Sequence, residues 1–255
     1  MSGSLKPPRP STVGILILDK PVGRTSMQAV ATVRRRAGGV RTGHAGTLDP
    51  LATGVLVIAL GRATKSIDRL MATDKRYRTE IDLSAFTTTD DREGERTEVD
   101  VVTPPSREAV EAALARFVGP IMQAPPTFSA VKIGGRRAYQ LARRGRPADI
   151  PARPVTIHAL RLDAYDYPRL EISIHCGKGV YVRSLARNLG EALGTGGHCA
   201  WIRRTAVGPF TVDEAMTLDA VPDPLEEAML ISIDDAMARV EADGASGPVT
   251  SVGGG

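Results

Sequence analysis

Cysteine is nearly absent from this 255-residue chain, which contains only Cys176 and Cys199. Two thiols cannot build a zinc site by themselves, and in a cytosolic chain we expect them to be free and reduced. Histidine is scarce as well, and the sequence has neither a His-x3-His spacing nor a Cys-x2-Cys pair. The sequence therefore predicts no metal site. The four histidines are His44, His158, His175 and His198.

Long apolar runs are also missing from the sequence. No segment approaches the roughly 20 apolar residues that a membrane-spanning helix needs. The first twelve residues, "MSGSLKPPRPST", lack the apolar core of a signal peptide. We therefore expect a cytoplasmic protein with no membrane partner, in which residues 1–12 form a disordered arm.

The overall composition is that of an ordinary globular protein, with 42% hydrophobic and 24% charged residues. The net charge is +4, the sequence pI is about 9.3, and arginine outnumbers lysine. Arginine binds phosphate in a two-pronged geometry that lysine cannot make. This bias is weak evidence for a nucleic-acid partner, because a GC-rich coding sequence would enrich arginine in the same way.

Helix signals are clear in three segments. "SMQAVATVRRRA" predicts a helix with Ser26 as its N-cap and Gly38 just past its end. "SREAVEAALARFVG" predicts a helix that is capped by Ser106 and ended by the Gly-Pro pair at Gly119. "YVRSLARNLGEALG" places its apolar residues on one helix face, with Gly194 at its end.

Strand signals are equally extensive. Alternation of apolar and polar residues over 153–167 and 169–176 predicts two long antiparallel strands. We expect buried strands at "VGILILDKP" and "GVLVIAL", a last strand at "CAWIRRTAVGPF", and a polar loop at "TTTDDREGERTEV". Because strands and helices do not alternate strictly, the fold class is α+β, with a mixed, mostly antiparallel central sheet flanked by helices.

One acidic residue lies in an unusual turn, "RTGHAGTLDPLATGVL". Asp49 stands between Leu48 and Pro50, with Gly46 and Gly54 on either side. A tight turn is one interpretation, because Asp-Pro pairs favour turn initiation.

A second unusual segment, residues 124–148, contains six basic side chains and no acid. Such a segment can be a solvated basic face, but those faces usually intersperse acids. With Phe128 and Tyr139 near the charges, the segment favours a clamp on a phosphate backbone. The six residues are Lys132, Arg136, Arg137, Arg143, Arg144 and Arg146.

"GHAGTLDPLATGVL" resembles the catalytic motif of the TruB-type pseudouridine synthases, which isomerise a uridine in the TΨC loop of tRNA. "LDKPVGRTS", "DKRYR", "APPTFSAVKIGGRRAYQLARRG", "CGKGVYVRSLARNLGEALGTGGH" and "WIRRTAVGPF" are similar to further motifs of that family, in the same order, from about residue 13 to residue 212. The resemblance implies a pseudouridine synthase fold with a catalytic domain over 13–212 and a basic, RNA-gripping thumb insertion at about 124–152. Residues 213–255 then form a short C-terminal segment, reduced or truncated relative to the family's RNA-binding domain.

The resemblance also implies catalytic roles. Asp49 matches the family's catalytic aspartate, Arg183 its partner for that carboxylate, and Tyr77 the residue that stacks on the target base and assists a late proton transfer. The reaction breaks the N1–C1′ bond of uridine and rejoins the base through C5. Nothing is oxidised and no group is donated, so we expect no cofactor. An aspartate suits this step as a nucleophile at C1′ or as a stabiliser of positive charge there. The resemblance also implies that Gly46 and Gly54 let backbone or RNA approach closely.

Four further residues match substrate-binding positions: His44, Tyr181, Ile202 and Lys20. Each has a plainer alternative, since Ile202 can be a core residue and Lys20 can pair with Asp19 on the surface. The resemblance implies tRNA as the partner, and the thumb-like segment favours the stand-alone bacterial type over the guide-RNA-dependent branch of the superfamily. The default expectation for the oligomeric state is a monomer. A role as a tRNA folding helper is the alternative from another functional class.

Overall fold

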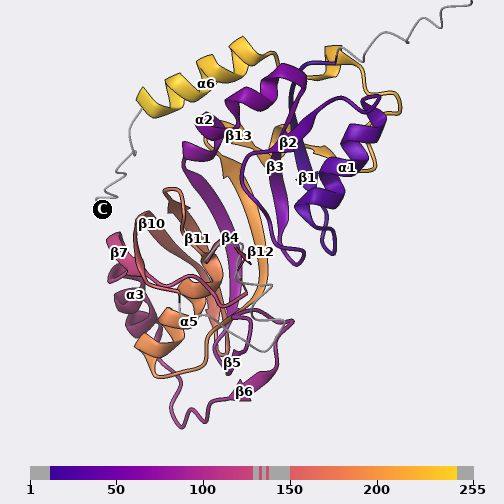
Figure 1. The fold of residues 1–255 in the computed structure, drawn as a ribbon. Helices are drawn as coiled ribbons and strands as arrows, with labels where there is room; N and C mark the ends of the chain where they lie inside the picture. The colour runs from indigo at the N-terminus through magenta and orange to yellow at the C-terminus, as the bar shows by residue number, and fades with distance from the viewer. Residues whose placement is uncertain (1–11, 129–131, 134–135, 138–149, 246–255) are drawn as a thin grey trace, which may run out of the picture. The chain divides into compact units, whose positions relative to one another are not determined.

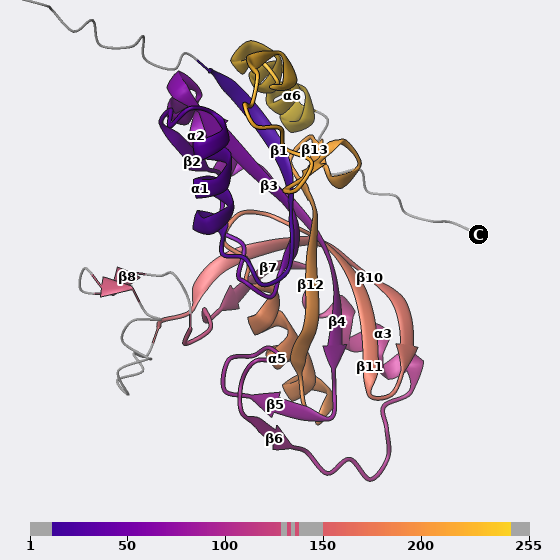
Figure 2. The same cartoon turned by 90° about the vertical axis from the view of Figure 1, so that its right-hand side faces the viewer.

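The computed structural model describes residues 12–128, 132–133, 136–137 and 150–245 of the chain. These residues form two compact units, shown in Figures 1 and 2. The first unit comprises Met1–Thr73 and Arg204–Gly255, and the second comprises Asp74–Arg203. No described helix is long and apolar enough to cross a membrane.

The first unit is a sheet of strands that carries helices on both sides. Figure 2 shows α1 and α6 on opposite sides of β1 and β3. β1 pairs antiparallel with β3 and parallel with β14, and β2 pairs with β3. Its elements are β1 (Gly14–Lys20), α1 (Ser26–Arg36), β2 (Thr42–His44), β3 (Thr53–Leu60), a 3-10 helix (Gly61–Ser66), α2 (Ile67–Ala72), β13 (Phe210–Thr211), β14 (Met216–Thr217) and α6 (Ile233–Ala245), with two further 3-10 turns at Val212–Glu214 and Glu227–Met229.

The core of this unit explains why the sequences of β1 and β3 are nearly continuous runs of apolar residues. Ile15 and Ile17 pack with Val55 and Val57 in a buried cluster that Leu70 of α2 also joins. The intervening side chains of both strands are buried on the opposite face as well. A strand that is covered on both faces needs apolar residues at nearly every position, as the sequence predicted.

The second unit is an antiparallel sheet in the order β4-β11-β10-β7, with β12 beside β4. α3 and α5 lie next to each other against this sheet (Figures 1 and 2). The elements are β4 (Lys75–Asp82), β5 (Ala85–Thr87), β6 (Arg96–Glu98), α3 (Arg107–Ala115), β7 (Gly119–Gln123), β8 (Lys132–Ile133), β9 (Arg136–Arg137), β10 (Arg153–Asp166), β11 (Arg169–Cys176) and α5 (Val182–Leu193). β12 (His198–Val207) has residues in both units.

The predicted α+β class with a mixed, mostly antiparallel sheet is confirmed, and so are the two long strands that became β10 and β11. Gly194 ends α5 in the left-handed conformation, with φ of 69°, as predicted. Cys176 and Cys199 are free and buried, and burial raises the pKa of each thiol to about 12.

Two predicted helix boundaries are wrong. The N-cap of α1 is Thr25, whose side chain accepts from Gln28 N in a capping box, and Ser26 is the first helical residue. α3 begins after Ser106 as predicted but ends at Ala115, and Gly119 instead opens β7. Ser26 and Gly119 are both residue types that suit a helix end, but Ser26 bonds the Asp49 turn and Gly119 begins a strand. Residue propensity alone cannot show such a difference.

Residues 213–245 pack into the first unit. β14 extends the sheet beside β1, with Leu18 opposite Met216. Ile15 and Ile231 exchange two backbone hydrogen bonds of 2.8 and 2.9 Å. The reduced C-terminal RNA-binding domain stays a prediction. Of residues 1–12, expected as an arm, 1–11 lie outside the described residues.

Candidate active site

In the turn that carries Asp49, the residues before and after this aspartate both form hydrogen bonds with the segment that follows β1. Ser26 Oγ donates to Leu48 O (2.9 Å) and accepts from Leu48 N (2.8 Å). On the other side, Gly23 N donates to Pro50 O (2.8 Å). Because the residues before and after Asp49 are both fixed, the position from which its carboxylate projects is fixed too. The motif "LDKPVGRTS" therefore has a structural task, namely to hold this turn.

Lys20 is the second anchor of the turn. It is fully buried, and its ammonium group donates to the carbonyl oxygens of Pro21 (2.8 Å), Arg24 (2.7 Å) and Pro50 (3.5 Å). Burial lowers the pKa of Lys20 from 10.5 to about 8, and the negative charge of Asp49 acts in the opposite direction. The surface ion pair that was the plainer alternative for Lys20 is wrong, since this lysine is a buried cation close to Asp49.

Arg204 is an anchor that the sequence analysis missed. This buried side chain donates from Nε to Val55 O (2.7 Å) and from Nη2 to Gly46 O (3.1 Å). It thereby ties the turn to the start of β3. A signal was present, because Arg204 falls on the buried phase of the alternation in β12, between Ile202 and Ala206.

The close backbone approach expected at Gly54 is confirmed. Gly54 has φ of 100°, and a Cβ built there would lie 2.1 Å from the carbonyl oxygen of Arg204. Only glycine fits such a contact. Gly46 also has a positive φ, of 93°, and lies next to the Arg204 guanidinium.

We expect the charge of Lys20 to appear in the pH dependence of stability. Its folded-state pKa of about 8 lies below the ordinary value of 10.5, so between these pH values the unfolded chain binds more protons here than the folded chain. Between these pH values, the free energy of unfolding of the parent protein should therefore rise with pH relative to that of Lys20→Met. Below pH 8 the buried lysine is charged, and the full cost of burying that charge is present. Urea unfolding of both proteins across the window measures this difference, and a difference independent of pH would contradict it.

His44 ends β2 in the first unit and pairs with Ile58 of β3. Its side chain is half-buried, five positions before Asp49 in the chain. The first unit thus contains three of the predicted site residues, namely Lys20, His44 and Asp49.

The second unit contains Tyr77, Tyr181, Arg183 and Ile202. Tyr77 is half-buried in β4, opposite Ile174 of β11. Ile202, in β12, is 5% exposed, so burial fits both the predicted pocket wall and the alternative of a core residue. Tyr181 and Arg183 flank the first residue of α5, Tyr181 as its N-cap.

Tyr181 is positioned through its backbone by Gln123, a residue that the sequence analysis missed. Gln123 is buried at the end of β7, where its amide oxygen accepts from Tyr181 N (2.8 Å) and its amide nitrogen donates to Tyr181 O (3.1 Å). Three residues after Tyr181, Ser184 Oγ donates to the carbonyl oxygen of Ala124, the residue that follows Gln123 (2.8 Å). The start of α5 is therefore fastened to the strand that precedes the basic segment.

Arg183 is buried and has several acceptors within its own unit. It donates to the carbonyl oxygens of Thr89 (2.9 Å) and Phe128 (3.0 Å), and Nη1 lies 3.4 Å from Asp91 Oδ2. Asp90, in the same loop, pairs with Arg187 on the next turn of α5. The segment predicted as a polar loop therefore supplies buried carboxylates that balance the arginines of α5, which its composition did not indicate.

The basic segment is described only in part. Lys132 lies in β8, and Arg136 and Arg137 lie in β9, two short strands that pair with each other. The positions of Arg143, Arg144 and Arg146 lie outside the described residues. The thumb insertion stays a prediction.

Residues 34–182, more than half of the chain, match the model described as "TruB family pseudouridylate synthase (N terminal domain)". Residues 183–238 match "tRNA pseudouridylate synthase B C-terminal domain".

Curated relatives agree with these matches. A tRNA pseudouridine synthase B of Caulobacter sp. (strain K31) is 50% identical over 229 residues, which cover 89% of this chain and 73% of the relative. A protein of the same name from Corynebacterium aurimucosum is 44% identical over 230 residues, 89% of this chain and 77% of the relative. Among solved structures, a chain in the crystal structure of a Cbf5-Nop10-Gar1 complex superposes with a TM-score of 0.69 at 27% identity, over 89% of this chain and 62% of that chain. The chain belongs to the TruB family of pseudouridylate synthases.

Proposed function

We propose that this protein isomerises the uridine at position 55, in the TΨC loop of tRNA, to pseudouridine. The relatives named tRNA pseudouridine synthase B, at 50% and 44% identity, support tRNA as the substrate. The observation that carries the proposal is the Asp49 turn. Its two flanking residues are fixed by Ser26 and Gly23, and the buried Lys20 cation lies beside it.

Asp49 is the reacting group in this proposal. Its carboxylate meets C1′ of the flipped-out uridine, either as a nucleophile or as a stabiliser of the positive charge that develops when the N1–C1′ bond breaks. N1 keeps the electron pair of the broken bond, the base turns, and C5 bonds to C1′. The proton on C5 is then lost, which restores the conjugated ring, and N1 takes up a proton, so that the product is an isomer of the substrate. A preorganised carboxylate suits this reaction because a charge that is already in place needs no reorganisation in the transition state.

The second unit supplies base recognition in the proposal. Tyr77 stacks on the flipped uracil and assists the late proton transfer, while Tyr181 and Ile202 provide apolar walls for the flat ring. Arg183 pairs with the catalytic carboxylate, and His44 meets the RNA loop. The fastening of Tyr181 by Gln123 supports this arrangement, because a recognition residue must keep its place while the base rotates.

The basic segment provides affinity for the tRNA backbone. Its six cations, with no acid among them, suit a phosphate chain and would make binding dependent on salt. A segment of this charge supports a stand-alone enzyme that needs no guide RNA.

The proposal is tested by incubating the purified protein with an unmodified tRNA transcript, without added cofactor or guide RNA, and mapping pseudouridine by chemical labelling. We expect one pseudouridine, at position 55. A transcript with cytidine at that position is the matched control and should remain unmodified. Modification only at other positions, or only after a guide RNA is added, would overturn the proposal.

A further inference from the structure

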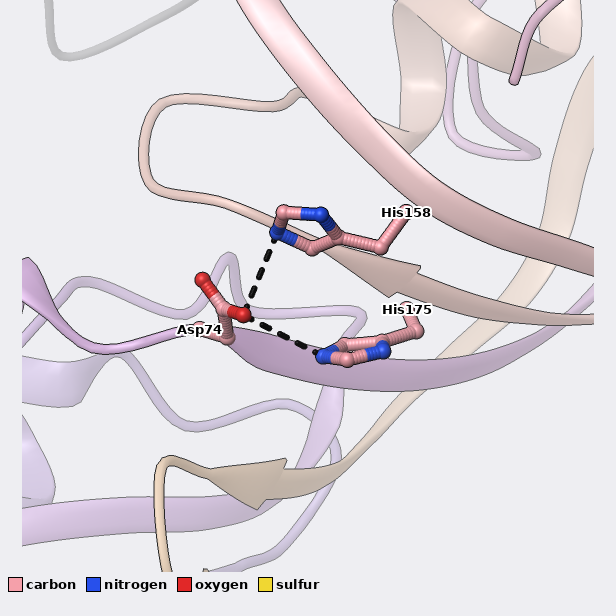
Figure 3. Close-up of side chains that lie close together, drawn as sticks. All are labelled: Asp74, His158 and His175. Carbon is pink, nitrogen blue, oxygen red and sulfur yellow. Dashed lines mark ion pairs between the residues drawn. The ribbon is translucent and has the colours of Figure 1, made fainter. Parts of the chain in front are cut away.

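Three side chains of metal-binding type meet in the second unit, although they lie far apart in the sequence. Asp74 immediately precedes β4, His158 lies in β10, and His175 lies in β11 (Figure 3). The Nε2 atoms of His158 and His175 lie 3.1 and 3.3 Å from the same oxygen, Asp74 Oδ2. The prediction of no metal site rested on ligand spacing along the chain, which cannot reveal a cluster assembled from three segments that lie far apart in the sequence.

The sheet itself brings the three ligands together. β11 ends beside the start of β4, which places His175 near Asp74. The register of β10 against β11 shifts between Ile157 and Ala159, so His158 is the extra residue on its strand. An extra residue of this kind re-aims a side chain, and such bulges are common next to functional sites.

The distances suit a four-coordinate ion. Zinc ligands at 2.0–2.2 Å in a tetrahedron lie about 3.3–3.6 Å from one another. The two contacts to Asp74, at 3.1 and 3.3 Å, are close to this spacing. All three ligand atoms lie within 4.8 Å of one another, and the two imidazole centroids are 4.9 Å apart. A modest rotation of the imidazoles therefore completes a triangle of ligands around one ion.

The surroundings leave room for the ion and for solvent. His158 Nε2 is buried and has no partner in hydrogen-bond geometry, although it is close to the Asp74 carboxylate. Gly177 lies beside the ligand atoms: a Cβ at this position would lie 3.7 Å from His158 Nε2 and 3.9 Å from Asp74 Oδ1. Because this position has no side chain, space beside the ligand atoms stays open. The side chains of the two histidines and Asp74 are 23%, 25% and 41% exposed, so an ion can reach them.

We propose that Asp74, His158 and His175 bind one Zn²⁺ ion, with a water molecule as the fourth ligand. Two imidazoles and one carboxylate suit a borderline-soft transition metal, whereas Mg²⁺ and Ca²⁺ prefer sets of oxygen ligands. The bound ion links β4, β10 and β11. It stabilises the strand that carries Tyr77 and the strand that leads toward Tyr181, and it takes no part in the isomerisation.

Zinc binding is measured on the full-length protein, without an affinity tag, after removal of metals with a chelator and exhaustive dialysis. Calorimetric titration with ZnCl₂ should give one site, and the melting temperature should rise with Zn²⁺ but not with Mg²⁺. Co²⁺ used as a spectroscopic probe should give the intense visible absorption of a four-coordinate site. These readouts use no tRNA, so they stand apart from the proposed enzymatic function.

Two variants and one control locate the site. His158→Gln and Asp74→Asn should each weaken Zn²⁺ binding by at least about 100-fold, since even the loss of an outer-shell partner costs 10- to 100-fold. Asp163→Asn, also in β10, removes a carboxylate that Arg161 holds at 2.9 Å, and it should leave binding unchanged. The absence of one-to-one binding in the parent protein would overturn the proposal, and so would a Zn²⁺ affinity in both ligand variants equal to that of the parent. Circular dichroism of each variant verifies that it is folded.

Discussion

Asp49→Asn is expected to abolish pseudouridine formation while tRNA binding survives. The amide is nearly the same size as the carboxylate, so the hydrogen bonds that hold Leu48 and Pro50 in the turn remain. It carries no negative charge, however, and cannot attack C1′ or stabilise a cation there. The single-turnover rate should fall by at least about 10³-fold, the scale seen when a reacting side chain is removed.

The measurement pairs single-turnover modification of tRNA with a direct binding titration. Asp68→Asn is the control: this exposed aspartate in α2 lies in the same unit, and its loss changes the net charge equally. Unchanged binding with lost modification would separate catalysis from a role as a tRNA folding helper. Activity of Asp49→Asn within about tenfold of the parent would exclude Asp49 as the reacting group, since removing a general acid or base alone costs about 10²-fold or more.

Gly54→Ala is expected to be the most destabilising single-methyl change in the first unit. Its Cβ would come within 2.1 Å of Arg204 O, a backbone atom that cannot move without disturbing β12. The left-handed φ of 100° adds strain. Together these effects should lower the free energy of unfolding by at least about 3 kcal/mol, or prevent folding altogether.

Gly119→Ala isolates the contribution of the backbone conformation. Gly119 has φ of 101°, almost the value at Gly54, but a Cβ there would have no atom within 4 Å. It should cost only about 1–2 kcal/mol, the penalty for a left-handed residue. Urea unfolding compares the two variants, and equal losses would show that the contact with Arg204 is not what requires glycine at position 54.

Local patterns predicted those parts of the fold whose physical cause is local. Alternation over β10 and β11 predicts strands because successive side chains point to opposite faces of a sheet. Gly194 predicts the end of α5 because glycine adopts the left-handed backbone conformation at little cost in free energy. Ser26 is the instructive failure: its hydroxyl suits a helix cap, yet Thr25 takes that position and Ser26 binds Leu48 instead.

The candidate site divides in the same way. The resemblance to the TruB family indicated Asp49, Tyr77 and Arg183, because motifs similar to those of the family occur in this sequence in the same order. The partners that hold the site come from distant segments. Gln123 meets Tyr181, and Asp91 meets Arg183. No local pattern marks such a pair, since each partner is buried only when the other is present to satisfy it.

By itself, then, the sequence determined the α+β class and the main strands and helices, because these depend on side-chain periodicity and short-range order. It also contained the motifs that resemble those of the TruB family. Only the tertiary structure decided that Lys20 is a buried cation near Asp49, that Arg204 ties the turn to β3, and that Asp74 meets two histidines. Burial and strand register create these contacts. Both are properties of the assembled sheet, in which residues far apart in the chain become neighbours.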